Sequence, residues 1–359
     1  MIEHSPITTG RLPRTGNLSH NLGVSAQTGA LRQRAAQHEA QSLWLDALQL
    51  AEEAQAHDPL RLAQFLDQLA KIYEANGDRA KATRLYERLT RLVEKTGCRG
   101  ELNRWRLHAW RQLAALQQAQ GCNGEAGRLW QNALQLAESL FGAHSLEAAE
   151  IQHRLAVLLQ DEGQLEEAYA HCQQALALYE DLFGEEHLTV ADLCHDLSRL
   201  EAARGRWDEA QHFAFRALVL RERRLGQAHP LLVADLTALA GILDIRQQFD
   251  EAEHLYQRAY EIVEQCYSAE HYEAAALLQK LARLLAARGA MQEAEHDYLR
   301  ALAIKEKLLG VENLEVAQLL RELAVFYRVQ THLQKAEVCS LRAARIFEKL
   351  HGESEVVEA

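Results

Sequence analysis

Small and apolar residues recur along this chain with a fixed period of 42 residues. Four series keep this period without slippage: Gly121, Gly163, Gly205 and Gly289, with Gln247 and Thr331 in the same series; Ala126, Ala168, Ala210, Ala252, Ala294 and Ala336; Ala133, Ala175, Ala217, Ala259, Ala301 and Ala343; and Leu113, Leu155, Leu197, Leu239, Leu281 and Leu323. A fixed period of this size predicts a solenoid, in which stacked copies of one unit bury a continuous core.

Residues 148–190 show how one unit is built. Ile151 and Leu155 belong to an apolar series at helical spacing, which predicts a first amphipathic helix. Gly163 ends this helix, and a second helix is predicted over residues 164–182. The small side chains of the alanines in the two 42-residue series let two helix backbones approach closely. The sequence therefore predicts an all-α fold, a solenoid of antiparallel helix pairs.

The spacing of leucine, glycine and alanine in this unit resembles that of the tetratricopeptide repeat. The resemblance is carried by Leu155-Ala156, by Gly163 eight residues after the leucine, and by Ala168 and Ala175 five and twelve residues after the glycine. The ordinary repeat has about 34 residues, so each unit here is about eight residues longer. The resemblance implies a right-handed superhelix whose concave face is formed by the first helices and binds proteins or peptides.

The additional length falls in the second helix and in the loop that follows it. At residues 226–230 this loop reads Gly-Gln-Ala-His-Pro, and residues 184–187 and 268–271 are weaker copies. The loop resembles the long repeats of kinesin light chains, a resemblance that concerns the subtype of the repeat. We expect the recurring histidine of this loop to form hydrogen bonds with local backbone beside the start of the next helix.

The repeat extends over most of the chain. Residues 1–28 are rich in Ser, Thr, Gly and Asn, which favours a disordered N-terminal tail. The solenoid is predicted over 29–352, with a degenerate first unit at 31–58 followed by seven units from Pro59. The last second helix is predicted to end at Gly352, and 353–359 to form a C-terminal tail.

Composition narrows the classes of function. The net charge of −12 argues against nucleic acid or an anionic membrane as partner, and no apolar run has membrane-spanning length. The six cysteines form no C-x-x-C pair, which favours reduced thiols and a cytoplasmic protein. Because no H-E-x-x-H, G-x-S-x-G or phosphate-binding glycine loop occurs, we expect no enzymatic activity, cofactor or metal.

The resemblance implies that polar positions of the first helices contact ligand. These candidate binding residues are His108, Arg111, His153, Arg154, His195, Asp196, Arg199, Gln279, Lys280, Arg283, Arg321 and Arg328. Kinesin light chains often hold two asparagines at the positions of His153-Arg154 and His195-Asp196, so their cargo role is not carried over. Zinc binding would need further ligands beside the histidines, and none is recognisable.

The predicted function is a protein- or peptide-binding scaffold or adaptor. Polar positions of the first helices carry a net charge of −3 over the first five complete units and +3 over the last two. We therefore expect an acidic or phosphorylated stretch of the partner at the C-terminal end. Two alternatives remain open: a regulatory or sensor module that acts on a separate effector chain, and a structural protein that self-associates through the solenoid ends.

Overall fold

The computed structural model describes residues 59–97 and 100–357, and these residues fold into helices and short connections. They divide into an N-terminal part, up to Leu140, and a C-terminal part from Phe141 onwards. The predicted tail 1–28 and the degenerate first unit 31–58 lie outside the described residues. Across the residues that are described, no helix is both long and apolar enough to cross a bilayer.

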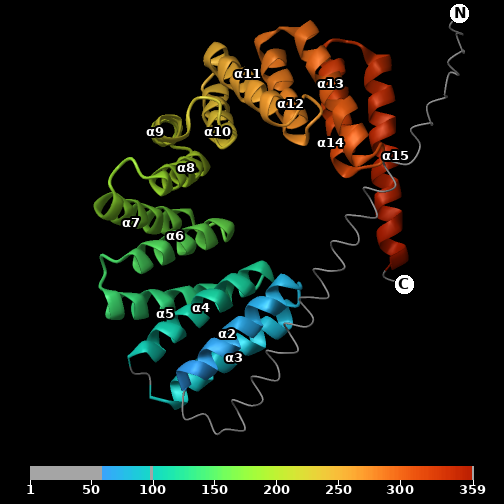
Figure 1. The fold of residues 1–359 in the computed structure, drawn as a ribbon. Coiled ribbons are helices and arrows are strands. Elements are labelled where there is room, and N and C mark those ends of the chain that lie inside the picture. The colour runs from blue at the N-terminus through green and yellow to red at the C-terminus, as the bar shows by residue number, and fades with distance from the viewer. Residues whose placement is uncertain (1–58, 98–99, 358–359) are drawn as a thin grey trace, which may run out of the picture. The chain divides into compact units, whose positions relative to one another are not determined.

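The N-terminal part contains two antiparallel helix pairs (Figure 1). Its helices are α2 (Pro59–Ala75), α3 (Arg79–Lys95), α4 (Glu101–Ala119) and α5 (Asn123–Phe141). Leu66, Leu69, Tyr86 and Leu89 are fully buried in the core that α2, α3 and α4 share. Asp78 begins α3, where its carboxylate accepts a hydrogen bond from the Lys81 backbone N–H. The amphipathic spacing of these leucines explains why each helix has one buried face.

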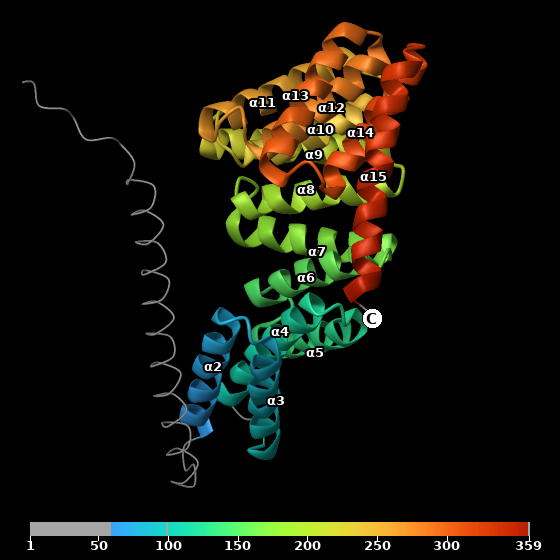
Figure 2. The ribbon, with the colours of Figure 1, turned by 90° about the vertical axis from the view of Figure 1, so that its right-hand side faces the viewer.

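The C-terminal part contains five helix pairs that stack in order (Figure 2). The first helices are α6 (Leu146–Asp161), α8 (Leu188–Ala203), α10 (Leu232–Ile245), α12 (Tyr272–Arg288) and α14 (Leu314–Val329). The second helices are α7 (Leu165–Phe183), α9 (Trp207–Leu225), α11 (Phe249–Cys266), α13 (Met291–Leu309) and α15 (Leu333–Val357). Each second helix begins 42 residues after the previous one. The all-α solenoid predicted from the sequence is confirmed.

The turn inside each pair requires a residue in the left-handed conformation. Gly163 and Gly205 have φ of 76° there, and Gly289 has φ of 94°. Gln247 and Thr331 occupy the same position of the repeat and both have φ of 61°. Residues with a Cβ pay a steric penalty in this conformation, which glycine avoids. The turn geometry is therefore kept in every pair, at a conformational cost in two of them.

The recurring loop histidines form backbone hydrogen bonds at the starts of first helices. His187 Nδ1 accepts from the Thr189 N–H at 3.2 Å, and His271 Nδ1 accepts from the Glu273 N–H at 3.3 Å. His229 accepts in the same way from the backbone N–H two residues later, at 3.2 Å. Because the first N–H groups of a helix lack partners within the helix, an acceptor there stabilises the helix start. The role predicted for these histidines is confirmed.

The two alanine series lie at the helix contacts. Ala168, Ala210 and Ala252 are fully buried, and so are Ala175 and Ala217 in the second series. The leucine series of the first helices is buried as well, with at most 8% of each residue exposed. The helix backbones approach closely at these positions, and the space between them holds only a small side chain. This explains why alanine recurs there.

The last helix differs from the prediction. Helix α15 runs continuously from Leu333 to Val357. It therefore does not end at Gly352, where we placed the end of the last unit, and residues 353–357 belong to it. A glycine weakens a helix by about 1 kcal/mol relative to alanine but does not by itself end one.

Overpacking at the alanine series should destabilise the fold. Ala210 is fully buried, so we expect Ala210→Leu to lower the free energy of unfolding by roughly 1–3 kcal/mol. The midpoint of thermal unfolding, followed by circular dichroism, measures the effect. An unchanged midpoint would show that Ala210 does not lie at a tight helix contact.

Removing the Cβ at a left-handed turn should stabilise the fold. The left-handed conformation costs a non-glycine residue roughly 1–2 kcal/mol, part of which the greater flexibility of glycine in the unfolded chain offsets. We therefore expect Thr331→Gly to raise the free energy of unfolding by about 0.5–1 kcal/mol. The reverse change, Gly205→Thr, serves as the matched control and should lower it. A loss of stability in Thr331→Gly would contradict this account.

Candidate functional site

Polar side chains of consecutive first helices bind one another in the C-terminal part. We call the surface that α6, α8, α10, α12 and α14 form the first-helix face. His153 Nε2, on α6, donates to Asp196 Oδ2, on α8, at 2.7 Å. Arg199 Nη1 lies 3.7 Å from the other oxygen of Asp196, whereas Arg154 is exposed. Three of the predicted binding residues therefore already form a cluster with one another.

A buried ionic network joins α8, α9 and α10. His195 Nδ1 donates to Asp235 Oδ1 at 2.8 Å, and Asp235 is fully buried. Arg221, on α9, donates to the other oxygen of Asp235 and to Asp192. Burial lowers the pKa of Arg221, but its bonds to the two aspartates outweigh this and hold the pKa above its ordinary value. His195 is thus oriented by a fixed carboxylate, and a part of its hydrogen-bonding capacity is already used.

Between the consecutive first helices α12 and α14, a side-chain amide replaces the histidine as donor to a carboxylate. Gln279 Nε2 donates to Glu322 Oε1 at 2.9 Å, and Lys305 Nζ donates to Gln279 Oε1 at 3.0 Å. Lys280, next to Gln279, is half-buried. Burial and the nearby charge of Arg283 lower the pKa of Lys280.

The N-terminal part contains two of the predicted residues. His108 Nε2 donates to Asp67 Oδ1 at 2.7 Å, and Lys71 Nζ lies 2.7 Å from Asp67 Oδ2. Burial raises the pKa of Asp67, but the hydrogen bonds from His108 and Lys71 outweigh it, so the pKa lies below its ordinary value. Arg111 is half-buried one turn further along α4. His108 therefore joins two consecutive first helices, as His153 does.

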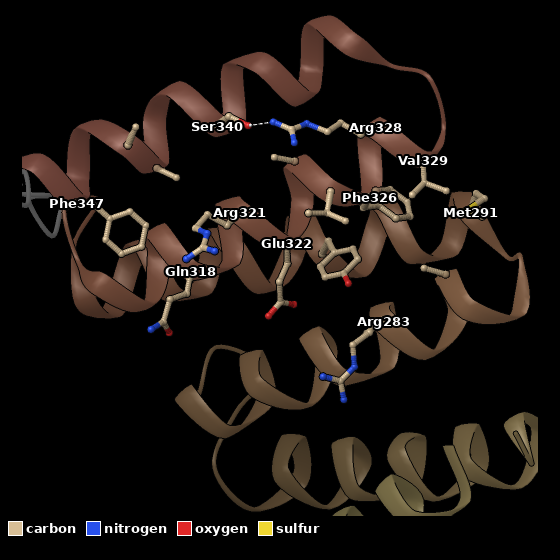
Figure 3. A pocket seen from close by; sticks show the side chains of 16 residues that line it. Arg283, Met291, Gln318, Arg321, Glu322, Phe326, Arg328, Val329, Ser340 and Phe347 are labelled. Carbon is tan, nitrogen blue, oxygen red and sulfur yellow. Dashed lines mark hydrogen bonds between the residues drawn. The ribbon is translucent and has the colours of Figure 1, made fainter. Parts of the chain in front are cut away.

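A pocket of about 1050 Å³ opens between α12, α13, α14 and α15 (Figure 3). Arg283, Arg321 and Arg328 line it, which brings together three residues that we predicted from separate positions in the sequence. Its other lining residues are Ala286, Met291, Tyr298, Gln318, Glu322, Ala324, Val325, Phe326, Val329, Ser340, Ala343, Ala344 and Phe347. Most of these side chains are apolar, so the pocket combines an apolar floor with positive charge.

The arginines of the pocket are available to an anion. Within residues 59–97 and 100–357, no ion pair joins Arg283, Arg321 or Arg328 to a carboxylate. The Arg321 guanidinium lies over the Phe347 ring, 5.8 Å from its centroid, and Arg328 Nη2 is 3.4 Å from Ser340 Oγ. Arg283 lines the pocket from α12 (Figure 3). Guanidinium groups that hold no carboxylate retain the donors that bind carboxylate or phosphate in two-pronged fashion.

Several residues of this surface were missed by sequence reasoning. Asp235 and Arg221 were not predicted, although they hold His195, and neither was Phe347, which stacks with Arg321. A signal was present in the sequence: the bonded first-helix side chains are separated by 40 to 43 residues, close to one period. In the described part of the chain, no three His, Cys, Asp or Glu side chains gather closely enough to hold a metal ion.

Stacked helix pairs with a polar first-helix face define a helical repeat protein of the solenoid class. A family model described as tetratricopeptide repeat matches residues 147–223 and 230–307, and another of the same description matches residues 66–100. Together these matches cover more than half of the chain. The protein therefore belongs to the tetratricopeptide repeat family.

Solved structures share this fold. The TPR-like repeats of a candidate kinesin light chain from Podosopora anserina are 25% identical, with a TM-score of 0.53 over 58% of this chain and 98% of that chain. BtubC (BKLC) from P. vanneervenii is 24% identical, with a TM-score of 0.55 over 63% and 91%. The apo quorum sensor NprR from B. thuringiensis is 13% identical, with a TM-score of 0.59 over 88% and 84%. No curated protein matches the sequence.

The buried network should be essential for stability. Removing the carboxylate in Asp235→Ala leaves Arg221, which is 8% exposed, without its buried partner. We expect a loss of roughly 3–5 kcal/mol in the free energy of unfolding, because an uncompensated charge stays buried. Asp192→Asn is the matched control: its side chain is 55% exposed, so its ion pair with the same arginine should contribute at most about 1 kcal/mol. Equal losses in the two variants, measured by chemical denaturation, would contradict this assignment.

Proposed function

We propose that this protein is a non-enzymatic scaffold or adaptor that binds a protein or peptide partner on its first-helix face. The family of the chain supports this role, because solenoids of stacked helix pairs present long surfaces for partners. The observation that carries the proposal is the pocket of about 1050 Å³. Among the described residues, none of its three arginines forms an ion pair with a carboxylate. A pocket of this size and apolar lining suits a side-chain anchor of a bound chain.

The charges of the first-helix face support an acidic or phosphorylated ligand at the C-terminal end. Asp192 and Asp196 already form ion pairs with Arg221 and Arg199. Among the described residues, the pocket arginines have no such pairs. A basic stretch of the partner would therefore have to compete with internal contacts near α8, whereas an acidic stretch meets unused donors near α14.

The proposal also includes a repeat subtype like that of kinesin light chains and a cytoplasmic setting. The loop at residues 226–230 and the 25–26% identity with the Podosopora anserina repeats support a subtype like that of kinesin light chains. Cys172 and Cys194 are buried free thiols. Burial raises the pKa of Cys194 to about 11. Unpaired thiols support a reducing, cytoplasmic setting.

Reversal of charge in the pocket tests the ligand class. We expect Arg283→Glu with Arg321→Glu to weaken the strongest partner recovered by affinity pulldown by about tenfold or more at low salt, because attraction is replaced by repulsion. The loss should shrink at high salt, since salt screens these charges. Both arginines are exposed, so the variant should keep the circular dichroism spectrum and thermal midpoint of the parent. Unchanged affinity at low salt would reject an acidic ligand in this pocket.

A further inference from the structure

One position of the first helix repeatedly reaches the next first helix. His153, His195 and Gln279 occupy this position in α6, α8 and α12, 42 or 84 residues apart. Each donates a hydrogen bond to a carboxylate on the following first helix: His153 to Asp196, His195 to Asp235, and Gln279 to Glu322. The distances are 2.7, 2.8 and 2.9 Å. At this position α6, α8 and α12 therefore each place a donor opposite a helix that carries an acid, whereas α10 has Thr237 there.

Arg321 occupies the same position in α14, 42 residues after Gln279. It is exposed, and no ion pair within the described residues joins it to a carboxylate. Its guanidinium lies at the rim of the pocket beside Phe347 (Figure 3). The donor that meets an acidic helix in three internal units is thus present here, with greater charge and with its donors open to a ligand.

A second position of the repeat, on the second helix, also contacts the following first helix in internal units. Arg221 donates to Asp235 on the following first helix, and Lys305 Nζ lies 3.2 Å from Glu315 Oε2 on the following first helix. Phe347 occupies the equivalent position of α15. An aromatic ring here cannot bind a carboxylate itself, but it supports the Arg321 guanidinium and offers apolar contact. Both positions of the last unit therefore face the space that a following first helix takes in the internal units.

Apolar side chains around this space are uncovered. Leu333 is 68% exposed, whereas Met291, Phe249 and Trp207, at the same position of the repeat, are half-buried against the core. Val329, which lines the pocket at the end of α14, is 70% exposed, and Ile245 at the same position of α10 is 56% exposed with a following helix in place. Burying such side chains removes apolar surface from water and is favourable, so an occupant needs an apolar stripe beside its acidic residues.

We infer that the α14–α15 face binds an amphipathic, acidic helix of a partner protein, seated where a following first helix packs in the internal units. This inference rests on the proposed function, and it adds the form and the charge of the partner segment. A helix is expected because a first helix packs at this place in the internal units. An acidic residue is expected because Arg321 would bind a carboxylate there. A second copy of the same face is disfavoured, because it would set Arg283, Arg321 and Arg328 against the same three positive charges.

The test uses a helix that this chain already shows to fit such a face. A fluorescein-labelled peptide with the sequence of residues 187–204 and Cys194→Ala carries Asp196, the acid that meets His153 in the internal contact. We expect saturable binding to the full chain, measured by fluorescence anisotropy, with a gain of helix in circular dichroism. Arg321→Glu should weaken this binding by about tenfold, and Asp196→Asn in the peptide by several-fold. Arg345→Glu, an exposed arginine of α15 outside the pocket, is the matched control and should bind like the parent.

Three results would overturn the inference. Equal binding by the Arg321→Glu and Arg345→Glu variants would show that the peptide binds elsewhere. Equal binding of a peptide with Leu197→Pro, which cannot form a continuous helix, would show that the face takes an extended segment. A dimer in sedimentation that Arg321→Glu abolishes would make a second copy the occupant. If these tests fail while the pulldown partner still needs Arg283 and Arg321, the scaffold function stands and the helical partner does not.

Discussion

The contact between a second helix and the first helix that follows it is the interaction on which this solenoid depends. One helix pair cannot bury its apolar face alone, so each pair depends on its neighbour to cover that face. The fully buried Ala210, Ala217, Ala252 and Ala259 make this coverage tight. Because equivalent positions recur at this contact, the internal units show which side chains of α14 and α15 correspond to those that meet a following helix elsewhere in the stack.

Polar contacts give this stack its register. A purely apolar interface between helices tolerates sliding, whereas a buried carboxylate can be satisfied at one place only. Asp235, fully buried between His195 and Arg221, is such a carboxylate. A buried ion pair often adds little net stability, because desolvation offsets attraction. We therefore interpret this network chiefly as a device that fixes how α8, α9 and α10 meet, and that holds His195 in one orientation on the first-helix face.

The sequence predicted what depends on period and missed what depends on side-chain direction. Helix pairs, buried alanines, the turn at Gly163 and the histidine caps such as His187 all follow from local pattern, and the structure confirms them. The pairing of His195 with Asp235 was not predicted, because the two residues belong to different units and meet only through packing. Likewise, a local pattern placed the end of the last helix at Gly352, but a glycine only weakens a helix that its neighbours support.

Net charge along the sequence is a poor guide to the polarity of the first-helix face, because paired charges must be set aside first. Asp192 and Asp196 contribute two of the acids counted near the N-terminal end of this face, yet both are held by arginines of the chain itself. Arg283 and Arg321 have no such partners among the described residues. An incoming group gains more from a donor that is unpaired than from one whose existing bond must break. The ligand preference that we propose for the pocket therefore rests on charges that hold no carboxylate among the described residues, and Arg283 and Arg321 are two of these.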